Sequence, residues 1–314
     1  MATRLRDCSE VILFFAIYKT CMIFSVLGEK GLAKEFGKKG TSTDITLYNA
    51  RRDSFVEPET YPDKVQSLYT AVAMSDAVIL YLTPKAMNFQ LAETLLLIDF
   101  LKKDKGIIVL EGVVREQVEP LLKGNVASTY EFMENDVPKL IDKTKELSAQ
   151  KSEGDPMVVI DHSFNVKSVG FVVLGYLKQG TIKKYDKLML HPAEKEVTIK
   201  SIQIHDKEYE GANAGDRVGL SLKGTDENEC SRGSVIGKAK SASEFKIEFR
   251  KNPFYQDEVP KKVMVGLGLQ YVQGEFENST VKTEKGLAYN DDDTVVVFDP
   301  GKKQRIVGAG IIVS

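Results

Sequence analysis

Hydrophobic and polar positions follow two different periods along the chain. From about residue 22 to 148, continuous apolar runs alternate with stretches in which apolar residues recur every three or four positions. The runs 77–82 and 106–110 are apolar throughout, which is typical of strands buried on both faces of a sheet. Beyond residue 156, short apolar runs are separated by Gly, Asp and Pro. The pattern therefore predicts an α/β part followed by an all-β part.

The first part is predicted to be a mainly parallel sheet with helices on both sides. Tyr61-Pro62-Asp63 opens a helix that places Val65, Leu68, Tyr69 and Val72 on one face, at the spacing of an amphipathic helix. The predicted strands are 22–27, 77–82, 106–110 and a weaker one at 126–129. The other predicted helices are a short one near 32–36, one at 89–103, and a last one that begins at Asp136-Val137-Pro138.

The all-β part is predicted to form two small barrels. A polar stretch at 148–156 lacks periodicity and is typical of a linker, and a further break falls near 240–243. The predicted strands are 157–160, 170–177, 187–190 and 197–204 before that break, and 245–249, 262–269, 294–298 and 306–313 after it. We therefore expect domains at 22–150, 157–240 and 244–314.

The N-terminal segment 1–21 does not fit this plan. Its apolar run 11–18 is shorter than the ~18 residues that span a bilayer, and no small-residue cleavage site follows it. Met22 directly precedes the first predicted strand. We interpret the segment as a buried strand, an appendage or the product of an upstream start, and expect no membrane partner.

Charge and cysteine content narrow the function classes. Lys and Arg number 43 against 45 Asp and Glu, which argues against a broadly basic protein that wraps nucleic acid but leaves room for a local RNA-binding patch. Cys8, Cys21 and Cys230 are scattered without metal-ligand spacing, so we expect reduced thiols in a cytoplasmic protein. The three histidines are equally scattered, and we expect no metal site.

Four segments of the all-β part carry a family resemblance: 164–184, 201–206, 214–224 and 231–236. Together they resemble the second domain of translational GTPases of the elongation factor Tu, elongation factor 1-alpha and SelB type. Gly37 to Tyr48 is similar to the switch I region of archaeal SelB-like factors. The resemblance implies a P-loop-GTPase-like parallel sheet followed by two small β-barrels, the last of which is matched by position and strand pattern.

The residues that bind the triphosphate of GTP in this family are missing from the sequence. A P-loop needs the pattern G-x-x-x-x-G-K-[ST] after the first strand, but the chain has only Gly28-Glu29-Lys30-Gly31 there. Lys19-Thr20 has no preceding glycine and is interpreted as a chance pair. By resemblance, Thr41 or Thr43 would ligate Mg²⁺ and sense the third phosphate; the alternative is a hydroxyl that caps a turn.

The remaining nucleotide motifs are degenerate too. Glu57 stands where the switch II aspartate would be, and the guanine-binding motif is missing after the strand 106–110, where Glu111 is most simply a solvated charge. Phosphoryl transfer depends on positioned charge, so losing these groups together predicts loss of GTP hydrolysis and no catalytic residue. GTP and Mg²⁺ remain implied only by the resemblance. A weak nucleotide site built on residues 28–31 and Thr41 is an alternative.

The resemblance also implies that the first barrel holds the aminoacylated 3′ end of a tRNA. The residues that would face that ligand are Val166, Lys167, Gly170, Gln203, His205, Asp206, Arg217 and Gly219. Those that could contact phosphates are Lys167, Lys178, Lys183, Lys184 and Arg232. The alternative is that the glycines set turns and the lysines keep a barrel soluble. Asp161-His162 and the cluster 290–293 are interpreted as non-catalytic, the cluster as a solvated turn.

The sequence thus predicts a SelB-like translation factor paralogue that binds aminoacyl-tRNA or the ribosome, monomeric and without a DNA partner. The chain ends at Ser314, where SelB carries an appended domain for messenger RNA, so selenocysteine recoding is in doubt. A regulatory module that binds protein partners on the same scaffold is the alternative from another class.

Overall fold

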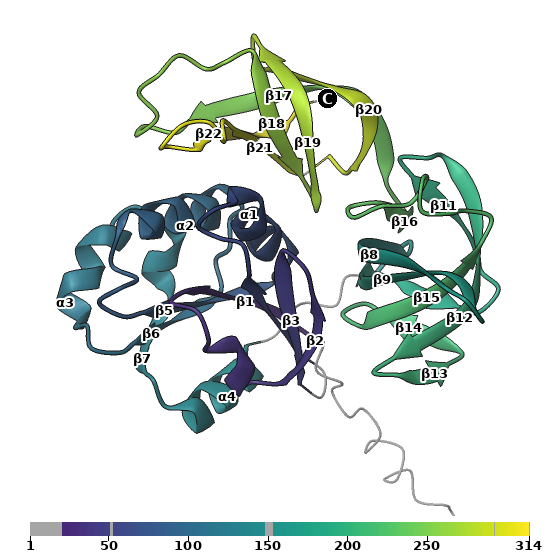
Figure 1. Ribbon diagram of the computed structural model, residues 1–314, viewed down its shortest axis with the longest axis horizontal. Coiled ribbons are helices and arrows are strands. Elements are labelled where there is room, and N and C mark those ends of the chain that lie inside the picture. Colours follow the sequence, from purple (N-terminus) through teal and green to yellow (C-terminus); the bar gives the residue numbers. More distant parts are fainter. Residues whose placement is uncertain (1–20, 51–52, 148–152, 292, 314) are drawn as a thin grey trace, which may run out of the picture.

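The computed structural model describes residues 21–50, 53–147, 153–291 and 293–313. The N-terminal segment with Cys8 and the Lys19-Thr20 pair lies outside the described residues, as do residues 148–152 of the predicted linker. Figure 1 shows three parts: a sheet flanked by helices, a first barrel beside it and a second barrel above it. The predicted fold class, a parallel sheet followed by two small barrels, is confirmed.

The first part is a seven-stranded sheet with the order β2-β3-β4-β1-β5-β6-β7. The parallel strands are β1 (Ile23–Gly28), β4 (Asp53–Pro58), β5 (Ala77–Leu82), β6 (Gly106–Leu110) and β7 (Glu131–Glu134). An antiparallel hairpin extends one edge and is formed by β2 (Lys38–Ser42) and β3 (Ile45–Ala50). In Figure 1 this hairpin lies on the side of the sheet that faces the first barrel.

Helices cover both faces of the sheet because neighbouring residues of its buried strands point to opposite sides. Helices α1 (Val65–Met74) and α2 (Phe89–Phe100) pack on the face that carries Val78 and Leu80. Helix α4 (Val137–Glu146) and the short 3-10 turn η2 (Ala33–Glu35) pack on the other face. The connection between β6 and β7 holds α3 (Arg115–Val118), η3 (Glu119–Leu122) and η4 (Val126–Thr129).

Three predictions for this part were wrong in detail. The helix expected near 32–36 is only the turn η2. Residues 126–129 form η4 instead of a strand, because the side chain of Asn125 accepts a hydrogen bond from the Ala127 N–H and so caps a helical turn. Helix α2 ends at Phe100 rather than 103, and Lys102 adopts a left-handed backbone (φ 51°) just beyond it. The start of α4 after Asp136 is confirmed.

The first barrel closes because β11 pairs with both β12 and β16. Its strands are β8 (Met157–Val166), β9 (Gly170–Gln179), β11 (Lys187–His191), β12 (Lys195–Ile204), β15 (Arg217–Lys223) and β16 (Val235–Gly237). Short extra strands are β10 (Thr181–Lys183), β13 (Lys207–Tyr209) and β14 (Gly211–Asn213).

The second barrel closes in the order β17-β20-β19-β18-β21-β22. Its strands are β17 (Lys240–Lys251), β18 (Lys262–Leu267), β19 (Gln270–Glu277), β20 (Thr280–Tyr289), β21 (Thr294–Phe298) and β22 (Ile306–Ile312). The break expected near 240–243 is instead the start of β17, whose register shifts between Ala242 and Glu244. A bulge of this kind lets a strand continue through a polar stretch such as Ser241-Ala242-Ser243.

The second barrel packs against the first part, and the two share a hydrophobic core. Tyr69 of α1 is fully buried, packs edge-on against Phe298 with ring centroids 5.3 Å apart, and donates a hydrogen bond from its hydroxyl to the Gly268 carbonyl. Arg305 donates from Nε to Oε1 of Glu93, a carboxylate only 3% exposed. Apolar packing and a buried ion pair therefore join the two parts.

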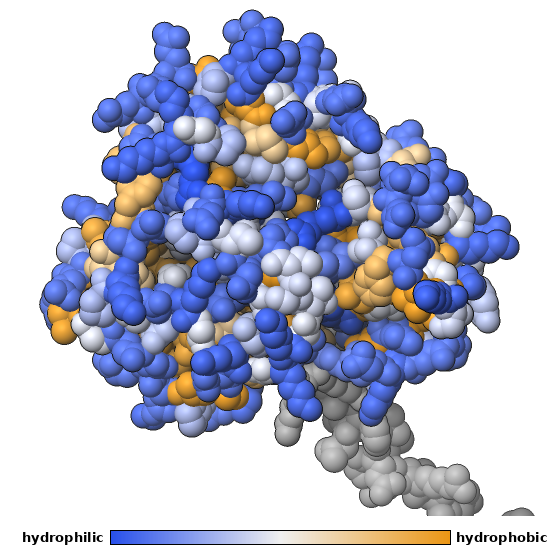
Figure 2. Space-filling view, in the orientation of Figure 1, coloured by the Kyte–Doolittle hydropathy of each residue, from blue (hydrophilic) through white to orange (hydrophobic). Residues whose placement is uncertain are grey.

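The exterior is polar on the face drawn in Figure 2, where orange side chains gather only in small separate patches. None of the helices in the described parts of the chain has the length and apolar character needed to cross a bilayer.

Candidate functional site

The loop after β1 is short and turns directly onto β5. Gly28 has φ +94°, and a Cβ placed on it would lie 2.1 Å from the carbonyl oxygen of Tyr81. The next N–H, of Glu29, donates to that same oxygen at 2.9 Å. Only glycine fits such a close crossing. The turn η2 follows at Ala33, so this loop does not lead into the longer helix whose N-terminus would bind phosphate.

The N–H groups of Gly31 and Ala33, which follow this crossing, bind a carboxylate of the protein itself. The N–H of Gly31 donates to Oε1 of Glu57 at 2.7 Å, and Glu57 is buried at the end of β4. Burial raises the pKa of Glu57, while the N–H groups of Gly31 and Ala33 and the charge of Lys30 partly oppose the rise. A carboxylate thus takes the hydrogen bonds that a phosphate would take in a nucleotide-binding loop.

Five of the residues predicted for a vestigial nucleotide site lie together here: Gly28, Glu29, Lys30, Gly31 and Glu57. Lys30 donates from Nζ to the carbonyl of Glu59 at 2.6 Å, and the Glu29 carboxylate accepts from the Thr83 hydroxyl at 3.0 Å. The charged side chains of the loop are therefore engaged within the protein. Their role in nucleotide binding stays a prediction.

Replacing Gly28 with alanine is expected to lower the free energy of unfolding by at least about 2 kcal/mol, because the new Cβ collides with backbone and the positive φ is strained. Gly31 is the matched control: it also has a positive φ (+99°), but a Cβ there meets nothing within 4 Å. Gly31→Ala should cost only about 1 kcal/mol. Urea unfolding of both variants measures the difference, and equal losses would contradict the close crossing at Gly28.

Thr43, which was predicted for a Mg²⁺ site, lies against the first barrel. Its Oγ1 is 3.2 Å from Nε2 of His162 and accepts from Nη2 of Arg232 at 3.3 Å. Arg232 also donates from Nη1 to Oδ2 of Asp44 at 2.7 Å. The hairpin β2–β3 is thereby tied to the first barrel, and Arg232, predicted for a tRNA phosphate, serves this connection.

A buried carboxylate organises the barrel side of the connection. Asp161 is 1% exposed; it accepts from Nη2 of Arg217 at 2.8 and 3.0 Å and contacts Nδ1 of His162 at 2.6 Å. Burial alone would raise the pKa of Asp161, but Arg217, His162 and Arg232 outweigh it and lower the pKa below its usual value. The β8–β9 register shifts between Ile160 and His162, and a bulge there re-aims the side chains around it.

Thr43, His162 and Asp161 are aligned as a nucleophile, a base and an acid would be. However, the single hydroxyl proton of Thr43 also has Asp44 Oδ1 as an acceptor at 2.9 Å, and Arg217 engages both oxygens of Asp161. We therefore interpret the group as an interdomain connection, and the absence of a catalytic role for Asp161-His162 stays a prediction.

Acid should weaken this connection. Burial opposes the lowering of the Asp44 pKa, but the hydrogen bond and charge of Arg232 and the hydroxyl of Thr43 prevail. A lowered folded-state pKa means that the stabilisation is present above the unfolded value near 3.8 and is lost as the pH falls through the folded pKa. The difference in unfolding free energy between wild type and Asp44→Asn should be largest near pH 7 and shrink towards about pH 3.

Urea unfolding at both pH values checks this dependence. Asp142→Asn is the control, since the side chain of Asp142 is 74% exposed on α4, and its effect should be small at both pH values. A gap for Asp44→Asn that is constant with pH would contradict a carboxylate charge at this contact.

A cleft of about 550 Å³ lies between the hairpin and the first barrel. It gathers Thr41 with five of the residues predicted to face tRNA: Gln203, His205, Asp206, Arg217 and Gly219. The remaining lining residues are Lys38, Lys39, Gly40, Asn49, Leu174 and Val218. Residues far apart in the sequence thus meet at one polar, mainly basic site.

The cleft contains two residues with an unusual backbone conformation and one buried donor without a hydrogen-bond partner among the described residues. His205 and Asp206 both have positive φ (50° and 61°), as the tight turn between β12 and β13 requires, and non-glycine residues rarely adopt this conformation. Nε of Arg217 is buried without a hydrogen-bond partner among the described residues. Such features are concentrated at functional sites.

Other predicted contact residues lie elsewhere. Val166, Lys167 and Gly170 form the tip of the β8–β9 hairpin, and Gly170 is four residues, about 13 Å along the strand, from Leu174 of the cleft. Lys178 lines a separate cavity where the three parts meet, and Lys184 is paired with Glu208 and Glu210. Lys183 is exposed. The tRNA roles of all these residues stay predictions.

Sequence reasoning missed Lys38, Lys39 and Asn49 of the cleft. Lys38-Lys39 stands inside the stretch that resembles switch I, and its two adjacent charges were the available signal. Of the other candidates, Glu111 accepts from the Tyr81 hydroxyl and from Asn135. In the cluster 290–293, Asp291 pairs with Lys240, Asp293 accepts from the Asn290 N–H, and Asp292 lies outside the described residues.

Comparisons with known proteins agree with this architecture. Residues 170–237 match the family described as elongation factor Tu domain 2. The chain is 35% identical over 296 residues to the uncharacterized protein MJ0325 of Methanocaldococcus jannaschii, covering 90% of this chain and 96% of that one. It is 26% identical to the selenocysteine-specific elongation factor of the same organism, over 65% of this chain but only 49% of that factor.

The fold has a solved counterpart. The structure of translation elongation factor SelB from Methanococcus maripaludis, in complex with a GTP analogue, superposes with a TM-score of 0.73 at 17% identity, over 94% of this chain and 79% of that one. The sheet and both barrels recur in that structure. The chain therefore belongs to the family of translational GTPases of the elongation factor Tu and SelB type.

Proposed function

We propose that the protein is a translation factor paralogue that binds the aminoacylated 3′ end of a tRNA in the cleft between the β2–β3 hairpin and the first barrel, without GTP hydrolysis. The observation that carries the proposal is the convergence of the cleft residues. Thr41 and two lysines from the first part meet Gln203, His205 and Arg217 from the barrel. Because the cleft is lined by the β2–β3 hairpin and by the first barrel, it favours a ligand that contacts the hairpin and the barrel at the same time.

The chemistry of the cleft suits the end of an RNA chain. Lys38 and Lys39 supply positive charge for phosphate oxygens, and Asn49 and Gln203 offer both donors and acceptors to the groups of a base or a ribose. Asp206 can accept from a hydroxyl or an ammonium group, such as the α-amino group of an amino acid. RNA is recognised mainly through single-stranded ends of this kind.

The loop after β1 supports the loss of nucleotide hydrolysis. Its Gly31 N–H binds Glu57, and its Lys30 binds a backbone carbonyl. A triphosphate at this place would have to displace a buried carboxylate and would meet a second acidic residue, Glu59, nearby. Like charges repel at such short range, so GTP binding is strongly disfavoured. Thr43, one of the two candidate Mg²⁺ ligands, accepts a hydrogen bond from Arg232 of the barrel.

Filter binding of aminoacyl-tRNA and of the same tRNA after deacylation tests the proposal. Aminoacyl-tRNA should bind more tightly, and its affinity should fall steadily as salt rises, because phosphate contacts release counterions. Calorimetry with GTP and Mg²⁺ should show no binding in the micromolar range. Salt-independent binding would contradict an RNA ligand, and micromolar GTP binding would contradict the closed loop.

The proposal places the protein in the cytoplasm beside the translation machinery, as a monomer. Relatives of the same family are named as elongation factors, and the ribosome is the natural second partner of such a factor. Co-sedimentation with ribosomes at moderate salt tests that second partner separately from tRNA.

A further inference from the structure

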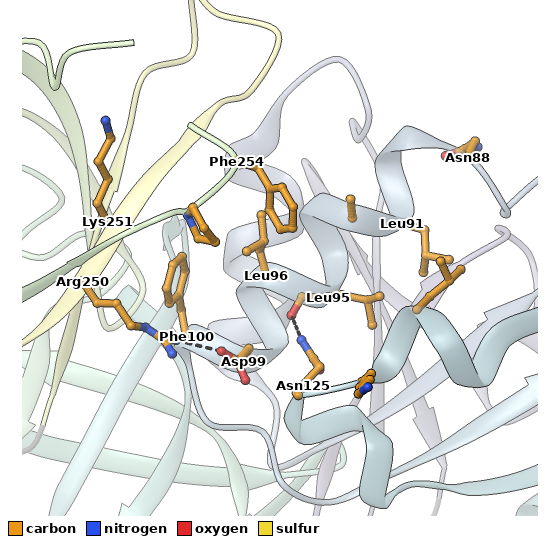
Figure 3. A pocket seen from close by; sticks show the side chains of 15 residues that line it. Asn88, Leu91, Leu95, Leu96, Asp99, Phe100, Asn125, Arg250, Lys251 and Phe254 are labelled. Carbon is orange, nitrogen blue, oxygen red and sulfur yellow. Dashed lines mark hydrogen bonds and ion pairs between the residues drawn. The ribbon is translucent and has the colours of Figure 1, made fainter. Parts of the chain in front are cut away.

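A second site lies on the opposite side of the first part, between α2 and the second barrel. It is an open groove of about 670 Å³. Leu91, Leu95 and Leu96 of α2 form its floor, and Leu121 and Phe254 stand at its sides. Figure 3 shows the ring of Phe254 over α2 close to Leu96, with Leu91 and Leu95 further along the helix. The cleft described above shares no residue with this groove.

Helix α2 is apolar around most of its circumference, and the chain covers most of it but leaves Leu96 half-buried and Ala92 exposed at the groove. Leu97 and Ile98 are completely buried in the core, and Leu91 and Leu95 are 5% and 7% exposed. Ala92 lies exposed on the outer side. A helix that is apolar on all sides is normally covered on all sides. The groove therefore leaves a narrow stripe of α2, formed by Ala92 and Leu96, open beside the exposed side chains of its walls.

The walls of the groove expose large apolar side chains on a fixed frame. Phe254 is 62% exposed and Leu121 is 50% exposed. Phe254 follows Asn252, which is 2% exposed, accepts from the Phe254 N–H at 2.9 Å and donates to the Ile306 carbonyl at 2.8 Å. The turn that presents the ring is thus held rigidly, which reduces the entropy lost when a partner packs against it.

The charges that border the groove are mostly positive. Lys123, Arg250 and Lys251 are basic, and Asp99 is the acidic residue among those that line the groove. Asp99 and Arg250 neutralise each other, because Nη2 of Arg250 donates to Oδ2 of Asp99 at 2.7 Å, a contact marked in Figure 3, so Lys123 and Lys251 supply the net positive charge. Arg250 also stacks over the ring of Phe100 at 4.8 Å. A partner with negative charge around an apolar stripe complements this border.

We propose that the groove binds an acidic amphipathic helix of another protein, with apolar side chains at i, i+3 or i+4, and i+7 directed at α2 and Phe254. The twelve residues of α2 span about 18 Å, which is the length of three turns of such a helix. The chain's own residues 1–20 have the wrong charge for this place, since they carry Arg4, Arg6 and Lys19 against Asp7 and Glu10.

Fluorescence anisotropy with the full chain tests the proposal. The probe is a labelled helical peptide with leucine at i, i+3, i+4 and i+7 and glutamate at its outer positions; a twin has lysine in place of each glutamate. The acidic peptide should bind at least about 10-fold more tightly than the twin. Phe254→Ala and Leu96→Ser should each weaken its binding about 10-fold, as expected for central anchor positions.

Two controls keep the result interpretable. Tyr185→Ala removes an aromatic side chain that is 74% exposed on the first barrel, and it should leave binding unchanged. Hydrogen exchange should become slower on peptide addition at the amides of α2 and of residues 250–254, and at the same peptide concentration the slowing should be smaller in Phe254→Ala. Thermal unfolding of each variant, compared with the wild type, separates a lost contact from a lost fold.

Other outcomes would overturn the proposal. Equal binding of both peptides, or binding that is insensitive to Phe254→Ala, would exclude a specific acidic partner. Peptide binding that appears only after deletion of residues 1–20 would show that the chain's own segment occupies the groove. A dimer in sedimentation that Phe254→Ala dissolves would assign the groove to a second copy of the protein.

Discussion

Replacing Arg217 with methionine is expected to lower the free energy of unfolding by about 3–5 kcal/mol. Methionine removes the guanidinium group that holds Asp161, a carboxylate whose side chain is 0% exposed. The two groups lie 2.8 Å apart, and after the change His162 stays beside the carboxylate, but burial leaves no water to replace the lost positive charge. Urea unfolding near pH 7, followed by circular dichroism, measures the change.

The double variant Asp161→Leu with Arg217→Met distinguishes an unpaired charge from a simple loss of packing. Removing both charges should recover most of the stability, because replacing a buried ion pair by apolar groups is often neutral. Lys187→Met is the surface control, since its contact with Glu196 joins side chains that are 65% and 61% exposed, and it should change stability by less than about 1 kcal/mol. A small effect of Arg217→Met alone would contradict the buried pair.

Reversing the charge of Lys38 and Lys39 together is expected to weaken aminoacyl-tRNA binding roughly 50–100-fold at about 0.1 M salt. Both side chains are exposed on β2 and line the cleft, so they can contact phosphate without supporting the core. Two lost contacts to a single strand should also make the dependence of affinity on salt shallower, by about 1.4 in the slope of log K against log salt concentration. Filter binding over a salt series measures both quantities.

Lys302→Glu with Lys303→Glu is the matched control. These two lysines are also adjacent in sequence and exposed, but they belong to the turn between β21 and β22 of the second barrel. The net charge changes equally in both double variants, so general electrostatics predicts equal losses of affinity. Equal losses would therefore count against the cleft as the place of phosphate contact.

The overall architecture could be predicted because its signals are local. The continuous apolar strands at 77–82 and 106–110 and the regular spacing of Val65, Leu68, Tyr69 and Val72 mark elements whose burial the structure confirms. The apolar pattern gave a wrong prediction where a polar side chain decides the conformation. Residues 126–129 were predicted as a strand, but Asn125 caps a helical turn there. The predicted break near 240–243 was wrong for a similar reason, because a bulge lets β17 run through this polar stretch.

The site could be predicted only in parts because its contacts span long stretches of sequence. The grouping of Gly28 to Gly31 with Glu57 follows from two parallel neighbouring strands, β1 and β4, whereas a nucleotide-binding role for these residues stays a prediction. That Thr43 would meet Arg232, 189 positions away, depends on how the first barrel docks. No local pattern encodes that docking, so Lys38, Lys39 and Asn49 were not recognised as neighbours of His205 and Arg217.

The affinity for aminoacyl-tRNA, measured with and without GTP and Mg²⁺, addresses both halves of the proposed function at once. Glu57 accepts from the Gly31 N–H of the loop after β1, and the cleft is already formed between the hairpin and the first barrel. Binding should therefore be the same in the presence and absence of the nucleotide. Binding that requires GTP, or the absence of any binding under both conditions, would contradict the account.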